Sequence, residues 1–211
     1  MVQNYSSQSS QQLESDGRHV VEAADELARV LTAHVEADWT ITTPDLIWSQ
    51  SQTAIHTMRA CLEYSFQVVG SRMDTYQPVL FEKKEAAAAS DYLTMIPTAA
   101  RVLHHVVAMA SPSDRAWHAY GISDPTGFAA MGVVEVSVHT FDLAKGFGDD
   151  FTPLDGPSAF AINRLFIDTV ETNDAFKAER PGRQLLWYAG RIELAGLKRR
   201  QGWKWNGLVR S

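Results

Sequence analysis

The chain has 211 residues, of which 45% are hydrophobic, and its 25 acidic and 19 basic residues give a net charge of -6. This length suits one large domain, and the apolar fraction is sufficient to bury a core, which excludes a disordered or fibrous chain. The acidic balance lacks the electrostatic footprint of nucleic-acid-binding proteins, so we expect no nucleic-acid partner. The single cysteine, Cys61, excludes an internal disulfide framework and suits a reducing compartment.

Residues 1–16 are rich in Ser and Gln. We expect a flexible tail here, because such a segment offers little apolar surface to offset the entropy lost on ordering. The segment lacks the apolar stretch of a signal peptide, and no later stretch reaches the ~18 apolar residues that a membrane-spanning helix needs. The sequence therefore predicts a single domain over residues 17–211, a cytoplasmic location and no membrane partner.

From residue 18 onward, apolar residues recur at every third or fourth position, which is the period of amphipathic α-helices. The predicted helices cover residues 18–37, 46–69 and 86–110, with a fourth segment from 124 to Gly146 or Gly148. A fifth begins near Pro157, and a sixth begins near Pro181 and ends by Gly196. The expected core positions of the third helix are Leu93, Ile96, Ala100, Leu103 and Val107, and those of the fifth are Ile162, Phe166 and Val170. The buried stripe of the second helix is expected to contain Ile55, Met58, Leu62, Phe66 and Val69. Pro97 must either kink the third helix or mark its true start.

Long amphipathic helices joined by short or medium loops favour antiparallel neighbours. We therefore predict an all-α fold, a bundle of four long helices with additional C-terminal helices. The fourth helix has the clearest start, because Asp124 is a good N-cap and Pro125 suits the first helical position. Near the C-terminus, residues 203–205 alternate Trp-Lys-Trp and are expected to form a short extended piece on the bundle.

The most informative stretch for chemistry is residues 132–143, which carries Glu135, His139 and Asp142 among valines and other apolar residues. On a helix these three polar side chains share one arc about 60° wide, while the rest of the circumference is apolar. Such a helix is buried, and a buried carboxylate needs a compensating partner. A divalent cation shared by Glu135 and His139 would supply it, since carboxylate and neutral imidazole both bind first-row metals.

A β-strand is the competing interpretation of this stretch, because Val134, Val136 and Val138 alternate with polar residues. In a strand Glu135 and His139 would lie ~13 Å apart, too far to share one ion. The helix start signals and the long span before the next glycine favour the helix.

A third ligand is offered by His56 on the second predicted helix. Facing helices of a bundle can complete a His, Glu, His triad with open positions, although a solvated polar face is the alternative for His56 considered alone. Asp142 is expected either to accept a hydrogen bond from a ligand histidine or to form an ordinary ion pair. The candidates for binding a substrate carboxylate are Arg59, Arg101 and Arg191.

Several common catalytic motifs, namely HExxH, the P-loop, GxGxxG and GxSxG, are absent from the sequence. Di-iron bundles carry Glu-x-x-His on two helices, whereas this chain has Glu-x-x-x-His on one, which favours a single metal ion.

Several blocks of sequence share features with one family. They are Trp39 with Thr43-Pro44 and Trp48 ahead of His56, DPTGFAAMG at 124–132, EVSVHTFDLA at 135–144, LLWYAGRI at 185–192 and WKWN at 203–206. Across residues 39–206 the chain resembles the DinB-like metal-binding superfamily, and most closely its mycothiol-dependent maleylpyruvate isomerase branch. The resemblance implies a four-helix bundle whose metal triad is His56, Glu135 and His139.

The same resemblance implies one divalent metal ion, zinc or sometimes nickel, and mycothiol or another small thiol as cosubstrate. The implied reaction is thiol S-transfer to a small electrophile, or thiol-assisted isomerisation. The full isomerase has a further C-terminal domain for which this chain is too short. The resemblance therefore implies the general thiol chemistry and not specifically the isomerisation of maleylpyruvate. The alternative functions are a non-catalytic metal-binding bundle and a metal-dependent hydrolase. The oligomeric state considered is a homodimer.

Overall fold

The computed structural model describes residues 2–82, 84, 87–169 and 171–209, and regular structure within these ranges is helical. The helices are α1 (Val2–Leu31), α2 (Gln50–Gly70), α3 (Ala89–Met109), α4 (Pro125–Gly146), α5 (Asp155–Leu165), α6 (Asp174–Lys177) and α7 (Pro181–Tyr188), with 3-10 turns η1 (Thr32–His34) and η2 (Ile167–Thr169). In the described ranges β structure is limited to three isolated bridges. The predicted all-α class is therefore confirmed.

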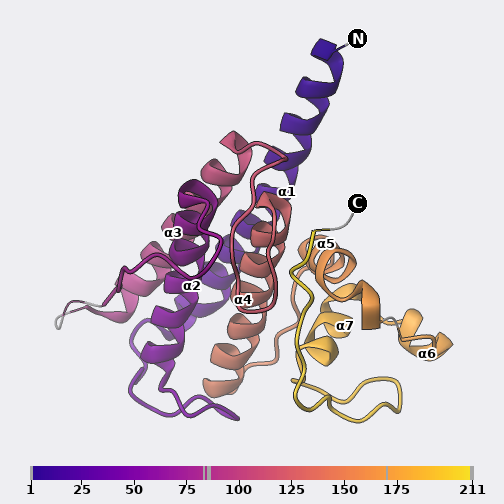
Figure 1. Ribbon diagram of the computed structural model, residues 1–211. Coiled ribbons are helices and arrows are strands. Elements are labelled where there is room, and N and C mark those ends of the chain that lie inside the picture. The colour runs from indigo at the N-terminus through magenta and orange to yellow at the C-terminus, as the bar shows by residue number, and fades with distance from the viewer. Residues whose placement is uncertain (1, 83, 85–86, 170, 210–211) are drawn as a thin grey trace.

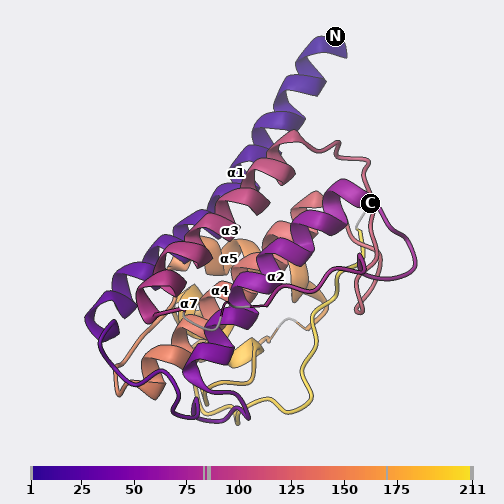
Figure 2. The same ribbon diagram turned by 90° about the vertical axis from the view of Figure 1, so that its left-hand side faces the viewer.

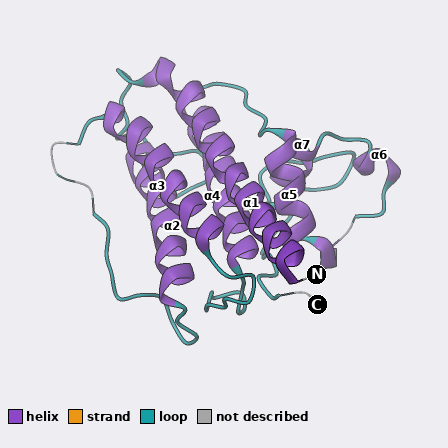
Figure 3. Cartoon of the chain, turned by 90° about the horizontal axis from the view of Figure 1, so that it is seen from above, coloured by secondary structure: helices purple, strands orange, loops and turns teal. Residues whose placement is uncertain are grey.

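The long helices α1 to α4 pack along one another and enclose the main core (Figures 1 and 2). Both α1 and α2 pack on α3 and on α4, while α5 packs on α4 and α1, and α7 packs on α5. Seen from above, α5, α6 and α7 lie to one side of the long helices (Figure 3). None of the helices in the described ranges has the length and apolar character needed to cross a membrane.

The segment expected to be a flexible tail, residues 1–16, is instead helical from Val2, and Met1 lies outside the described residues. Leu13 and Asp16 are buried, and the Asp16 carboxylate accepts hydrogen bonds from Thr126 Oγ1 at 2.6 Å and Gln12 Nε2 at 2.7 Å. The Ser- and Gln-rich composition does not indicate this buried face, because Asp16 is buried with a hydrogen bond from Thr126 of α4, 110 residues further along the chain.

Helix α2 begins with a capping box in which the Ser49 side chain and the Gln52 side chain each bond the other residue's backbone N–H. The predicted buried stripe of α2 is largely wrong. Met58 is buried, but Ile55 and Leu62 are half-buried, and Phe66 and Val69 are 43% and 71% exposed.

The buried face of α2 is instead built from small and polar residues. It contains Thr53, Ala54, Thr57, Cys61, Tyr64, Ser65 and Val68. The Thr57 and Ser65 hydroxyls donate to backbone carbonyl groups one turn earlier, at Thr53 and Cys61, which allows these polar residues to be buried without loss of hydrogen bonds. A hydrophobicity pattern cannot detect a face of this kind.

Helix α3 continues through Pro97 without a break, and four of its five predicted core positions are buried: Ile96, Ala100, Leu103 and Val107. The C-terminal helices differ more from expectation, because α7 ends at Tyr188 rather than near Gly196, and the short α6 was not predicted. The predicted core position Val170 lies outside the described residues. Residues 203–205 lack regular structure, with Trp205 buried.

Helix α4 confirms the helical interpretation of residues 132–143 and is buried nearly all round. Its start is the predicted one: Asp124 Oδ1 accepts the Gly127 N–H at 2.7 Å, and Pro125 occupies the first turn. Arg164 Nη2 also donates to Asp124 Oδ1, at 2.9 Å. The cap therefore fixes where α4 begins, and with it the position of every polar residue along the helix.

We expect Asp124→Ala to lower the free energy of unfolding by about 1 to 2 kcal/mol, because the first turn of α4 loses its cap. Asp124→Asn retains a capping oxygen and should lose much less. Urea denaturation of both variants measures the difference. Equal losses would show that the ion pair with Arg164, rather than the cap, provides the stability.

Candidate metal centre

Two helices bring the three predicted ligands together. Glu135 and His139 lie one turn apart on α4, and His56 faces them from α2. His56 Nε2 lies 3.1 Å from Glu135 Oε2, and His139 Nε2 lies 3.4 Å from the same oxygen. One ligand atom from each residue falls within 4.8 Å of the other two. The group can therefore hold a metal ion.

The donor set fits a divalent cation of the zinc type. Two imidazole nitrogens and one carboxylate oxygen form one of the usual three-residue sets of catalytic zinc sites, in which a further position remains for water or substrate. No second group of this kind occurs among the residues that the structure describes. Glu135 is 13% exposed at its side chain, so water screens its charge only weakly.

The imidazole of His139 is oriented by a buried carboxylate. Asp142 Oδ2 lies 2.9 Å from His139 Nδ1, so Nδ1–H donates to it in the tautomer that leaves Nε2 free for a cation. Arg191 in turn donates to both Asp142 oxygens, from Nε at 2.8 Å and from Nη2 at 2.9 Å. Asp142 therefore makes both contacts expected for it, a hydrogen bond with His139 and an ion pair, here with Arg191.

The structure adds a fourth residue, Tyr64, that the sequence did not point to. Its hydroxyl donates to Glu135 Oε1 at 3.3 Å, and its side chain is buried. On a helix, a tyrosine among apolar residues resembles an ordinary core position, although a buried hydroxyl needs an acceptor. Tyr64 occupies the second oxygen of Glu135, which leaves Oε2 facing both histidines.

The charges of the cluster shift its pKa values in opposite directions. Burial raises the pKa of Glu135, but hydrogen bonds from His139 and His56 outweigh it and hold that pKa well below its ordinary range. Burial lowers the pKa of His139, but hydrogen bonds and charge from Asp142 and Glu135 raise it to about 9. In Asp142, His139 and Arg191 outweigh burial and lower the pKa. Without a cation, protonated imidazole compensates the buried carboxylate.

The three candidate arginines have different surroundings. Arg191 is engaged by Asp142 and therefore orients the site instead of presenting a free guanidinium. Arg101 is not brought to the site, because it pairs with Asp25 at 2.7 Å and both side chains are about half exposed. Arg59 lines a cavity beside His56. Of the three, Arg59 alone keeps a geometry suited to a ligand carboxylate.

A cavity of about 260 Å³ borders the cluster and contains all three ligand residues in its wall. The remaining wall is Leu46, Trp48, Tyr120, Val134, Val138, Arg191, Trp203 and Trp205. A second cavity of about 450 Å³ shares Trp48 and His56 with the first. The Trp48 and His56 ring centroids are 4.6 Å apart, so the two rings together form part of the wall of both cavities.

Comparisons of the chain with protein-family models, curated proteins and solved structures found no match. The resemblance to the DinB-like superfamily therefore remains a prediction. The geometry of the three ligands and of Asp142, Arg191 and Tyr64 carries the case for a metal centre.

Tyr64→Phe should weaken zinc binding by roughly tenfold, because the residues that hold a ligand typically contribute 10- to 100-fold to metal affinity. Tyr92→Phe is the matched control, since Tyr92 is equally buried but packs on Trp39 away from the cluster. Competition against a chromophoric chelator gives both affinities. Equal affinities in the two variants would show that Tyr64 does not support Glu135.

In chelator-treated protein, stability should fall as the pH rises from about 6.5 to about 9. The pKa of His139 is raised from 6.5 to about 9, so the protonated ring stabilises the fold fully below pH 6.5, and this contribution is lost as the ring deprotonates. The loss is on the order of 3 kcal/mol by linkage. Urea denaturation between pH 6 and 9.5 measures it, and His139→Gln should flatten the slope. An unchanged slope in that variant would assign the effect to another group.

Proposed function

We propose that this chain is a metal-dependent enzyme that transfers a small thiol to an electrophile or uses the thiol to isomerise one. His56, Glu135 and His139 would hold one divalent cation, with zinc the first choice and nickel the second. The observation that best supports this proposal is that the three-residue group borders a cavity. Structural zinc sites usually close with four protein ligands, whereas three ligands facing a cavity leave room for a substrate.

The proposed fold is a DinB-like four-helix bundle formed by α1 to α4. The packing of α1 and of α2 on both α3 and α4 supports it, as does the placement of the ligands on facing helices. The short C-terminal helices and the segment that follows them then add to this bundle Arg191, Trp203 and Trp205, which line the cavity.

A bound divalent cation with an open position lowers the pKa of a thiol or water and so makes a nucleophile available at neutral pH. The chain's own residues prepare that position. Asp142 and Arg191 fix the His139 ring, Tyr64 occupies Glu135 Oε1, and Trp48, Trp203 and Trp205 line the cavity beside the cluster.

The thiol must come from outside the chain. Cys61 is the single cysteine, it is fully buried, and burial together with the charge of Glu135 raises its pKa to about 12. A thiol of this kind is almost entirely protonated at neutral pH and cannot serve as the nucleophile. In the proposed reaction the thiol is therefore a cosubstrate, mycothiol or a similar small molecule.

The test compares His56→Ala with His105→Ala, a control at an exposed histidine on α3. We expect His56→Ala to lose most of its bound metal, measured by elemental analysis, because only two ligands remain. Its rate of mycothiol transfer to monochlorobimane should fall at least 100-fold, while His105→Ala keeps both properties. Full metal content and full thiol transfer in His56→Ala would contradict the proposal.

Two other functions predict different results in the same assay. Turnover that is indifferent to added thiol would favour a metal-dependent hydrolase, which needs the same ligands. A large drop in melting temperature on metal removal, with no turnover of any thiol and electrophile pair, would favour a non-catalytic bundle in which the ion ties α2 to α4.

A further inference from the structure

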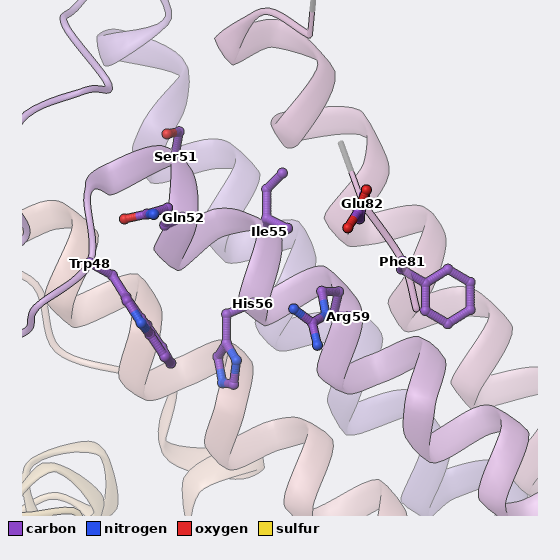
Figure 4. A pocket seen from close by; sticks show the side chains of 8 residues that line it. All are labelled: Trp48, Ser51, Gln52, Ile55, His56, Arg59, Phe81 and Glu82. Carbon is purple, nitrogen blue, oxygen red and sulfur yellow. The ribbon is translucent and has the colours of Figure 1, made fainter. Parts of the chain in front are cut away.

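The larger cavity, of about 450 Å³, lies beside the candidate metal centre and has the size of a small-molecule site. Figure 4 shows its lining side chains, which come from α2, from the loop before α2, and from the chain ahead of α3. They are Trp48, Ser51, Gln52, Ile55, His56, Arg59, Phe81 and Glu82. Because Trp48 and His56 also line the smaller cavity, a ligand here would lie next to the cluster.

Arg59 lines this cavity with hydrogen-bonding capacity that the fold uses only in part. Its Nε is buried and has no acceptor. Its Nη2 lies 3.3 Å from Glu63 Oε1, and the two side chains are 36% and 29% exposed, so this pair contributes little stability. A buried donor without an acceptor is unfavourable, because it has lost its hydrogen bonds to water. In Figure 4 the Arg59 head group extends toward His56.

The other walls restrict the kind of ligand. Trp48, Ile55 and Phe81 supply apolar surface for a small hydrophobic body. Glu82 also lines the cavity but is exposed, and Glu63 already neutralises part of the Arg59 charge. These two carboxylates disfavour a ligand with several negative charges, such as a phosphate ester, and leave room for a single carboxylate.

We propose that this cavity binds a small amphipathic carboxylate, with its carboxylate on the Arg59 guanidinium and its apolar body between Trp48, Ile55 and Phe81. The carboxylate accepts hydrogen bonds from the terminal nitrogens of Arg59. The assignment of this carboxylate as the electrophilic second substrate rests on the proposed function. Binding in the cavity does not, because none of the groups that contact the molecule needs a cation.

Calorimetric titration with 3-phenylpropanoate and with its neutral amide tests the site. We expect the carboxylate to bind at least tenfold more tightly than the amide to the unmodified protein. Arg59→Gln should remove this preference, Arg59→Lys should restore part of it, and Arg101→Gln, which changes an arginine outside the cavity, should keep it. Equal affinity for acid and amide, or the same result for Arg59→Gln and Arg101→Gln, would overturn the proposal.

The same titration on Glu135→Gln protein separates the two proposals. Carboxylate binding that depends on Arg59 and persists in this variant supports the cavity site, even if elemental analysis finds no metal in the unmodified protein. Binding that disappears in Glu135→Gln but survives in Arg59→Gln would place the anion on the cluster and overturn the cavity site, while the proposed metal chemistry would stand.

Discussion

The carboxylate of Glu135, only 13% exposed at its side chain, is the constraint on which the arrangement of this protein depends. It lies in the middle of α4, which is apolar nearly all round, where an unpaired charge would be unfavourable by several kcal/mol. His56, Tyr64 and His139 surround its two oxygens. Since two of these partners come from α2, the need to satisfy Glu135 also fixes which face of α2 turns inward.

Further contacts extend this arrangement to the parts of the chain after α4 and before α2. Asp142 connects His139 to Arg191, so the segment after α7 is held to the site by charge-assisted hydrogen bonds. Asp45 lies 2.9 Å from Lys145 Nζ and 3.2 Å from Arg199 Nη1, which joins the loop carrying Trp48 to α4 and to the C-terminal segment. The cavity wall is thus assembled from segments that are distant in sequence.

Among the described residues, four buried side-chain atoms lack a hydrogen-bond partner: Arg59 Nε and Trp205 Nε1 at the cavities, and His104 Nδ1 and Ser158 Oγ elsewhere. Most buried polar atoms in folded proteins have a partner. Arg59 and Trp205 both line cavities next to the cluster. Local departures from a fully satisfied interior are expected where a protein binds a ligand, because the missing partner can be supplied by the ligand.

The sequence by itself determined the features that depend on local geometry. The period of apolar residues predicted the all-α class, the Asp124 cap predicted the start of α4, and the i, i+4 spacing placed Glu135 and His139 on one face. Spacing also put Asp142 near His139. These predictions succeed because a helix has fixed dimensions, so neighbours along it are known once the helix itself is known.

Only the tertiary structure decided the contacts between elements. The direction of His56, the role of Tyr64 and the pairing of Arg191 with Asp142 depend on how helices and loops meet across the core. The inward face of α2 and the helical residues after Val2 escaped prediction for a related reason. Their buried polar side chains are stabilised by specific hydrogen bonds, and a pattern of hydrophobicity records only the cost of burying a polar group, not the partner that offsets it.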